Sequence, residues 1–351
     1  MITRKNITAL RMERQHFTVP VEERNYDSLF CSLSPVPTVY WCAPGAPPTL
    51  PLHVDLDDYA YNSLRRSRRD ILKGRFAGGS IAYVTKEDLE VFACLYRKDI
   101  DSYTMIQAGL MELLEREGPM NIGLMKEFTG LKVKDITPAL HRLQEAFLVF
   151  EDQADNEGDR SWYLFDREFP EVDLSRYTKA EALQLIIPRF AGMLVGFHDT
   201  MLKSYYKVPR KVIREAVAEL QKNKVLSEIQ VDHETLYMSF EDVELLSSTD
   251  FTIKPAVLLL QRNDFLVRAN FEELKLKFNS AWDTLYYILI DGEFHGAVTG
   301  RFKFGPHIIE DMVLDISEEE LKNRLDEILE AVAAVFDPAE SPVRRINGIE
   351  R

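Results

Sequence analysis

The chain has 351 residues, 46% of them hydrophobic, and a formal net charge of −14. This length allows two or three modules, because single hydrophobic cores seldom grow past a few hundred residues. The negative net charge excludes a protein that coats nucleic acid with a basic surface all round, since phosphate contacts require clustered lysine and arginine.

The first 101 residues are predicted to form a helical region interrupted by an irregular connection. Proline density between 34 and 52 excludes helix interior and central strand there. The predicted elements are helices over 7–17, 21–33 and 57–72, a hairpin over 76–84 that turns at Gly78 and Gly79, and a helix capped by Thr85 and Asp88.

Residues 103–168 have the pattern of a winged helix. Apolar residues recur at helical spacing after Ser102 until Gly118, and again over 122–128 and 134–146. Two strands, 147–151 and 161–165, follow around a polar loop. Three helices followed by a hairpin with a polar tip predict a winged helix.

The same order returns between residues 180 and 240. Helices are predicted over 179–197, 199–206 and 210–222, and strands over 225–231 and 234–239. The third helices also match in register at one constant offset: Ile136, Ala139, Leu143 and Gln144 recur as Ile213, Ala216, Leu220 and Gln221. This match indicates an internal repeat.

The remainder is predicted to be a mixed α/β module. It holds a strand over 257–260, a helix over 271–278, a hairpin of 284–290 with 297–304 turning at Asp291 and Gly292, a strand over 307–314 and a last helix capped by Ser317 and Glu320. The fold class is therefore α+β with tandem winged-helix domains. The expected domains are 1–101 (helical region with proline-rich loop and hairpin), 102–170 and 171–250 (winged helices) and 251–351 (C-terminal module).

The helix-turn-helix geometry places the third helix of each winged helix in the major groove. Its outward positions include Lys134 and His141 in the first unit, and Lys211 and Arg214 in the second. The second helix is flanked by the further cations Lys203, Lys207, Arg210 and Lys224, and by Tyr205, whose ring could stack on a base. Two alternatives remain open: winged helices also bind proteins, and such cations are often only solvated.

A basic cluster on the predicted helix 57–72 and just after it is a second candidate for phosphate contact. Its members are Arg65, Arg66, Arg68, Arg69, Lys73 and Arg75. Like charges at helical spacing repel one another unless an anion is near. Pairing with the neighbouring Asp55, Asp57, Asp58 and Asp70 explains the cluster equally well.

The chain has a family resemblance that rests on four segments in a fixed order. They are LRMERQ, GRFAGGSIAYVTKEDLEVF, LLLQRNDFLV and LYYILIDGEFHGAVTGRF. It resembles the winged-helix DNA-binding family that contains the YcaQ- and AlkZ-type DNA glycosylases of crosslink and alkylation repair. The resemblance implies tandem winged helices around damaged duplex DNA. It also implies a Gln-x-Gln or Gln-x-Asp motif near the end of an early helix that positions the hydrolytic water.

The matching position is Ser32-Leu33-Ser34, which keeps the spacing but neither glutamine. A serine hydroxyl is a weak base and a poor counter-charge for a developing sugar cation. Ser32, Ser34 and Asp57 are the catalytic candidates, although Asp57 also suits a helix cap. Tyr40 and Trp41 are candidates for stacking on an extruded base, or for anchoring the proline-rich loop.

The sequence supports little other chemistry. The cysteines Cys31, Cys42 and Cys94 form no C-x-x-C motif, and no Walker loop or G-x-S-x-G motif occurs. We expect no cofactor, no nucleotide and no metal ion. The chain is expected to be a monomeric, cytoplasmic protein without membrane segments that binds double-stranded DNA, damaged or intact. An active glycosylase with other catalytic residues and a transcriptional regulator are the alternatives.

Overall fold

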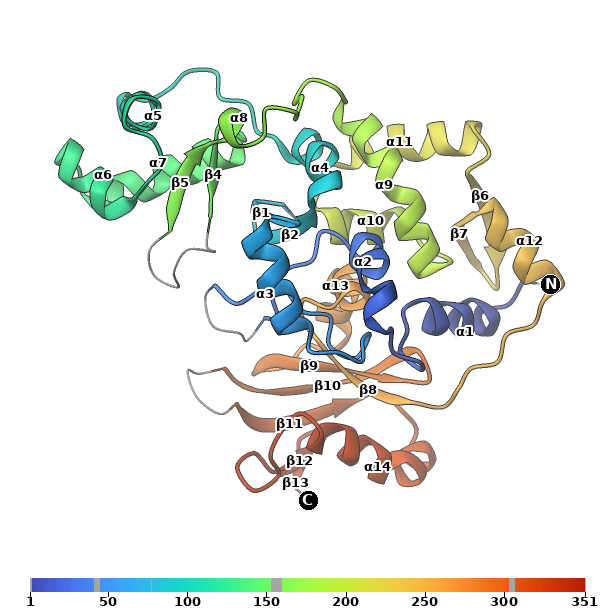
Figure 1. The fold of residues 1–351 in the computed structure, drawn as a ribbon. Helices are drawn as coiled ribbons and strands as arrows, with labels where there is room; N and C mark the ends of the chain where they lie inside the picture. Colours follow the sequence, from blue (N-terminus) through green and yellow to red (C-terminus); the bar gives the residue numbers. More distant parts are fainter. Residues whose placement is uncertain (1, 41–44, 77, 153–159, 303–306, 351) are drawn as a thin grey trace. The chain divides into compact units, whose positions relative to one another are not determined.

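The computed structural model describes residues 2–40, 45–76, 78–152, 160–302 and 307–350 (Figure 1). The chain forms two compact units, each assembled from segments that are distant in the sequence. Unit 1 consists of Met1–Val21, Ala191–Tyr205 and Lys224–Arg351, and unit 2 of Glu22–Phe190 and Tyr206–Asn223.

Unit 2 begins with helices around a two-stranded antiparallel hairpin. Its first elements are α2 (Glu23–Ser32), α3 (Asp58–Arg68), β1 (Ile71–Gly74), β2 (Ala82–Thr85), the 3-10 turn η1 (Lys86–Asp88) and α4 (Leu89–Tyr96). The hairpin turn at Gly78 and Gly79 is confirmed, because both have positive φ.

Two expectations for this region were wrong. The predicted helix 57–72 ends at Arg68, because Arg69 adopts a left-handed conformation with φ 61°, and residues 71–74 are strand β1 instead. Thr85 makes no side-chain capping bond, and the Asp88 carboxylate accepts from Arg189, so the predicted capping pair is absent. The Asp88 carboxylate is engaged in a tertiary ion pair instead of a local capping bond.

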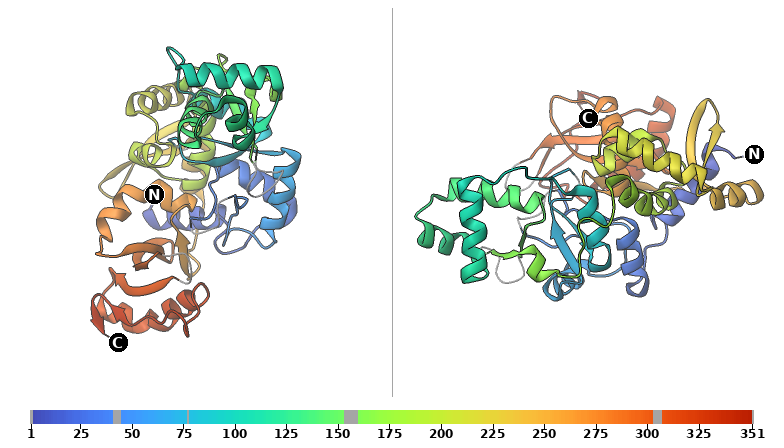
Figure 2. Two further views of the ribbon diagram at one scale, coloured as in Figure 1. Left: turned by 90° about the vertical axis from the view of Figure 1, so that its left-hand side faces the viewer. Right: turned by 90° about the horizontal axis from the view of Figure 1, so that it is seen from above.

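The first winged helix follows in unit 2, as predicted. Its elements are α5 (Met105–Glu117), β3 (Met120–Asn121), α6 (Ile122–Thr129), α7 (Val133–Glu145), β4 (Val149–Glu151), β5 (Ser161–Leu164) and α8 (Phe165–Glu168). Its strands pair in the order β3-β5-β4. Leu110, Ile136, Leu140 and Trp162 are buried in one shared core, and the helices and short sheet of this winged helix are drawn in teal to green in Figure 2.

The elements of the second winged helix are α9 (Lys179–Leu194), α10 (Asp199–Tyr206), α11 (Arg210–Lys222), β6 (Leu226–Val231) and β7 (Glu234–Ser239). The helix α11 belongs to unit 2, and the β6–β7 hairpin belongs to unit 1. The repeat is matched in burial: Ile213, Ala216 and Leu220 are buried like their partners in α7, whereas Gln221 is only half-buried.

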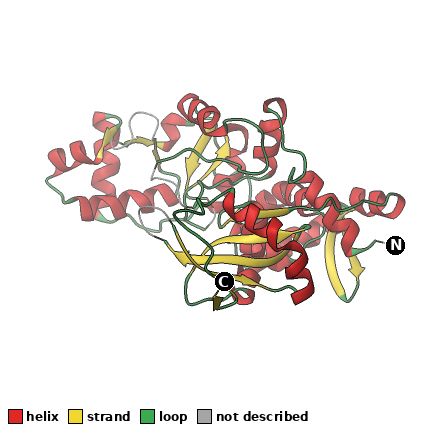
Figure 3. Ribbon diagram, turned by 90° about the horizontal axis from the view of Figure 1, so that it is seen from below, coloured by secondary structure: helices red, strands yellow, loops and turns green. Residues whose placement is uncertain are grey.

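Unit 1 is built on a six-stranded sheet in the order β13-β12-β11-β10-β9-β8 (Figure 3). The bounds are β8 (Val257–Gln261), α13 (Phe265–Lys277), β9 (Asp283–Ile290), β10 (Glu293–Arg301), β11 (Ile308–Leu314), α14 (Glu318–Ala333), β12 (Arg345–Ile346) and β13 (Ile349–Glu350). Tyr287 contacts Phe278 and the adjacent Tyr286 contacts Phe336. Since neighbouring strand residues face opposite sides, both faces of this sheet are covered.

A smaller core in unit 1 holds α1 (Arg4–Arg14), the β6–β7 hairpin and α12 (Phe240–Ser248) together. Ile7 and Leu10 of α1 are buried against Val231 and Met238. Arg14 donates to the buried Asp242 carboxylate at 2.8 Å and to the Gly192 carbonyl at 2.9 Å. Apolar packing and a charged bond thus fix α1 in this unit.

The fold is α+β with tandem winged-helix elements and a C-terminal mixed module, as the sequence indicated. The domain boundaries at 101, 170 and 250 remain predictions. Across the described residues, no helix is both long enough and apolar enough to cross a membrane.

Candidate nucleic-acid interface

Ser32 and Ser34, the residues at the place where a glutamine motif was expected, donate to the backbone of α2. The Ser32 hydroxyl donates to the Ser28 carbonyl at 2.9 Å, and the Ser34 hydroxyl donates to the Phe30 carbonyl at 2.8 Å. Ser34 is only 2% exposed. The Phe30 carbonyl is one of the last four of α2, which have no amide partner within the helix, and the Ser34 hydroxyl satisfies it, whereas the Ser32 hydroxyl bonds back to a carbonyl one turn earlier.

The carboxylate of Asp57 caps a helix. It accepts a hydrogen bond from the Ala60 amide at 3.1 Å at the start of α3. Its neighbour Asp58 is buried and accepts from the Leu50 amide at 2.6 Å and from the Tyr26 hydroxyl at 3.1 Å. Burial raises the pKa of Asp58. A catalytic role for Asp57 stays a prediction, and its observed contact is structural.

Arg65 of the basic cluster points into unit 2. It is 7% exposed, donates to the Asn62 side-chain oxygen at 2.9 Å and pairs with Asp27 at 3.1 Å. Its guanidinium carbon lies 4.8 Å from the ring centre of Phe30, within range for a cation–π contact. The guanidinium nitrogens that could donate to a DNA phosphate are therefore already engaged by Asn62 and Asp27.

Arg69 and Lys73 bind the first winged helix. Arg69 donates to the Asp152 carboxylate at 2.8 Å and also pairs with Glu168. The Lys73 ammonium lies 2.9 Å from the Glu151 carboxylate, and both side chains are only 3% exposed. The cluster therefore joins α3 and β1 to the β4 region of the winged helix.

The other three members of the cluster differ in exposure. Arg66 is half-buried and donates to the Gly45 carbonyl. Arg75 is half-buried and donates to the Gln144 side chain at 2.8 Å. Arg68 is exposed. Of the six predicted contacts in this cluster, we retain only Arg68 for a DNA interface.

The recognition helix of the first winged helix, α7, offers one exposed candidate. Lys134 is exposed near its N-terminus. His141 is half-buried with its ring centre 6.3 Å from that of Trp162. Burial, with a smaller effect of Arg75, lowers the pKa of His141, so its ring is neutral near pH 7.

The recognition helix of the second winged helix, α11, has a fully exposed basic face. Arg210, Lys211 and Arg214 are exposed, as is Lys207 just before the helix. Within the described part of unit 2, Lys211 of this face pairs with Glu215 one turn along the same helix, at 3.8 Å. The opposite face is buried in the core. These cations are therefore presented to solvent by a packed helix.

The two remaining cationic and aromatic candidates before α11 lie in unit 1. Lys203 is exposed on α10. Tyr205, expected to offer a stacking ring, is fully buried with the Arg268 guanidinium 4.1 Å from its ring centre, and burial raises its pKa to about 12. The expectation for Tyr205 was therefore wrong, because a buried ring cannot stack on a base.

The stacking candidates of the proline-rich loop remain predictions. Tyr40 is 39% exposed. Trp41 lies outside the described residues.

A cleft of about 500 Å³ in unit 2 was missed by the sequence analysis. Cys31, Arg68, Asp88 and Arg189 line it. Arg189 donates to Asp88 at 2.8 Å, and the Cys31 thiol lies 3.3 Å from the same carboxylate. Burial raises the pKa of Cys31 to about 11, which keeps this thiol protonated. Since these partners are distant in the sequence, no local pattern signals them.

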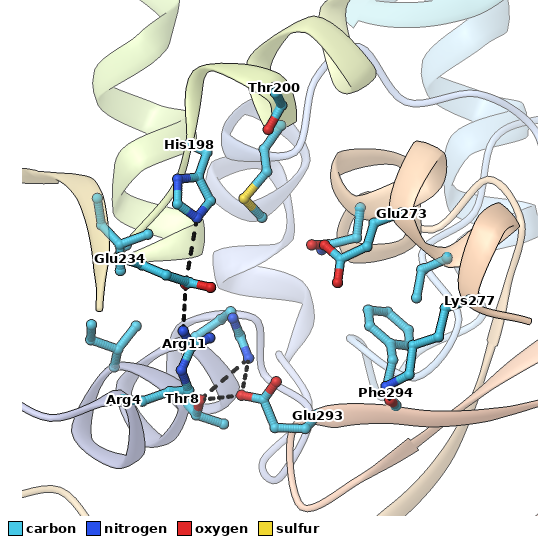
Figure 4. A pocket seen from close by; sticks show the side chains of 16 residues that line it. Arg4, Thr8, Arg11, His198, Thr200, Glu234, Glu273, Lys277, Glu293 and Phe294 are labelled. Atoms are coloured by element: carbon cyan, nitrogen blue, oxygen red, sulfur yellow. Dashed lines mark hydrogen bonds and ion pairs between the residues drawn. The ribbon is translucent and has the colours of Figure 1, made fainter. Parts of the chain in front are cut away.

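A smaller pocket of about 190 Å³ lies in unit 1 (Figure 4). On one side Arg4 pairs with Glu234 at 2.5 Å and Arg11 with Glu293 at 3.1 Å, and Glu273 stands across from them. These charges largely neutralise one another, so the pocket does not favour a phosphate. Among the residues that the structure describes, no three histidine, cysteine or acidic side chains are grouped to hold a metal ion.

These elements form an α+β fold with tandem winged-helix elements. Over 98% of this chain and 99% of that chain, the structure matches Streptomyces sahachiroi DNA glycosylase AlkZ with a TM-score of 0.65 and 14% sequence identity. At this identity the likeness shows the fold alone. No protein-family model matches the chain, and no curated protein matches it.

Proposed function

We propose that this protein binds duplex DNA through the exposed basic face of α11, on a scaffold of the AlkZ type that serves DNA repair. The observation that carries the proposal is the alignment of Arg210, Lys211 and Arg214 on a helix whose other face is buried at Ile213 and Leu220. Such a helix can lie in a groove without unfolding, and its cations can neutralise phosphates.

The first winged helix is the weaker contact in this proposal. Lys134 is exposed on α7, whereas Arg69 and Lys73 are engaged within unit 2. We therefore assign Lys134 and Arg68 supporting phosphate contacts, which position a protein on DNA without reading its sequence.

The proposal is tested by binding to plain and alkylated duplexes over a range of salt concentrations. The variant Arg210→Ala/Lys211→Ala/Arg214→Ala should bind both duplexes more weakly. A matched control, Lys254→Ala/Lys275→Ala/Lys322→Ala, removes the same charge from exposed positions of unit 1 and should bind as the parent protein does. A parent protein with no duplex affinity, or with affinity independent of salt, would overturn the proposal.

A second candidate, an active glycosylase, is favoured by the likeness to the AlkZ structure. Its test is incubation with alkylated duplex, followed by cleavage at abasic sites. Because both serine hydroxyls are bonded to helix carbonyls, Ser32→Ala/Ser34→Ala should leave any activity unchanged. Activity abolished in this variant, with folding intact, would restore the serines as catalytic residues. Binding to one specific sequence without cleavage would instead indicate a regulator.

A further inference from the structure

The turn of the β1–β2 hairpin contacts the segment that precedes α11. Gly78 has φ +76°, and a Cβ at this position would lie 2.7 Å from the Lys207 Cβ. Lys207 itself has φ 56°, three residues before α11 begins. Only glycine allows this backbone conformation and this close approach together.

The same turn contacts the C-terminal end of α7. Gly79 has φ +97°, and a Cβ there would lie 3.1 Å from the side-chain oxygen Oε1 of Glu145, the last residue of α7. Arg75 donates from one nitrogen to the Gln144 side chain at 2.8 Å and from another to the Gly79 carbonyl at 3.0 Å. The turn is thus bonded to α7 through Arg75.

The helix α4, which follows the hairpin, supports the same two segments. The Lys98 amide, two residues past α4, donates to the Glu145 carbonyl at 2.9 Å. The Tyr96 hydroxyl donates to the Tyr206 carbonyl at 2.9 Å in a buried position. The hairpin and α4 therefore both contact the end of α7 and the residues before α11, and Figure 1 draws the hairpin between these helices.

We propose that the β1–β2 turn is a spacer that sets the position of α11 relative to α7, with Gly78 and Gly79 as its positioning residues. All of these contacts lie within unit 2. The spacer holds the two recognition helices at one separation. Its consequence for DNA rests on the proposed function: two contacts held at a fixed spacing bind one long duplex far more tightly than either contact alone.

The spacer itself is tested without DNA, by measuring the distance between spin labels on the two helices. Labels at Arg142→Cys on α7 and Ala218→Cys on α11 occupy exposed positions, in a protein with Cys31, Cys42 and Cys94 replaced by alanine. Gly78→Ala should broaden or shift the distance distribution. Gly45→Ala is the matched control, because Gly45 also has positive φ, +89°, but has no atom within 4 Å of an added Cβ. An unchanged distribution in Gly78→Ala overturns the spacer.

The consequence for binding is tested by duplex length. We expect the parent protein to bind a duplex of about 30 base pairs about a hundredfold more tightly than one of about 10, which spans a single helical turn. Gly78→Ala should reduce this ratio at least tenfold while leaving affinity for the short duplex unchanged.

A second variant tests the spacer without changing a glycine. Arg75→Ala should lower the length ratio in the same way, whereas a direct phosphate contact by Arg75 would lower affinity for the short duplex as well.

The label and duplex measurements together separate the spacer from the proposed function. If the label distances respond to Gly78→Ala but no duplex binds, the spacer stands and the proposed function fails. If DNA binds but neither the distances nor the length ratio respond to Gly78→Ala, the spacer fails and the proposed function stands.

Discussion

The basic cluster around α3 and the basic face of α11 both have closely spaced lysine and arginine residues, but they differ in how exposed those side chains are. Lys73 and Glu151 are both 3% exposed as an ion pair, whereas Arg210, Lys211 and Arg214 face solvent. The difference lies in the partners that the fold brings to each. The strand β4, which ends at Glu151, packs beside β1, whereas the outer face of α11 is exposed to solvent. Positive charge in a sequence therefore predicts a DNA contact only where the fold leaves the cations exposed to solvent.

The largest expected effect comes from removing the buried ion pair of the basic cluster. Lys73→Met should lower the free energy of unfolding by about 3–5 kcal/mol, because it removes one charge of a buried pair and leaves the other poorly compensated. Arg160, 2.9 Å from Glu151, offsets part of this loss. Urea unfolding measures it, with the exposed Lys134→Met as a control expected to change stability by less than about 0.5 kcal/mol. Equal stabilities would refute the structural role of the cluster.

The buried pair should also make stability depend on pH. Burial opposes ionisation of Glu151, but the charges of Lys73 and Arg160 outweigh it and hold the Glu151 pKa below its ordinary value of 4.5. Its ionised form therefore stabilises the fold above about pH 4.5, and this contribution is lost as the pH falls through the lowered pKa. Glu151→Gln should cost about 2 kcal/mol at pH 7 and progressively less in acid. A difference between the two proteins that stays constant from pH 7 to about pH 3 would contradict the assignment.

Substitutions on the exposed basic face of α11 should weaken DNA binding and leave the stability of the fold almost unchanged. Replacing Arg210, Lys211 and Arg214 by alanine should reduce the slope of log affinity against log salt by about 2.7, at about 0.9 for each lost phosphate contact. Affinity at low salt should fall about tenfold or more, and unfolding should change by less than about 0.5 kcal/mol. Fluorescence anisotropy across a salt series measures the slope. An unchanged slope would move the interface away from α11.

The smallest expected effect concerns Asp57. Asp57→Ala removes the N-terminal cap of α3 and should cost about 1 kcal/mol of stability, whereas Asp57→Asn keeps an acceptor and should cost much less. Neither change should alter DNA binding or any base release. Thermal unfolding gives the stabilities. Loss of base release in both variants, with stability retained, would show that Asp57 is catalytic.

The sequence by itself determined the winged-helix elements. Helical periodicity and turn residues are local signals, so the bounds of α6, α7 and α11 agree closely with the predicted ranges. The register match between the third helices also had a physical basis, because Ile136 and Ile213 both face a core.

Only the tertiary structure decided which charges remain free and which hydroxyls are occupied. Arg69 meets Asp152 83 residues away, and Arg189 meets Asp88 101 residues away, so no local pattern could reveal either pair. Tyr205 looks like an available ring in sequence and is buried, with Phe265 and Arg268 of the distant helix α13 packed against it. Ionic and aromatic contacts depend on distances of a few ångströms between remote segments, and the chain acquires those distances only when it folds.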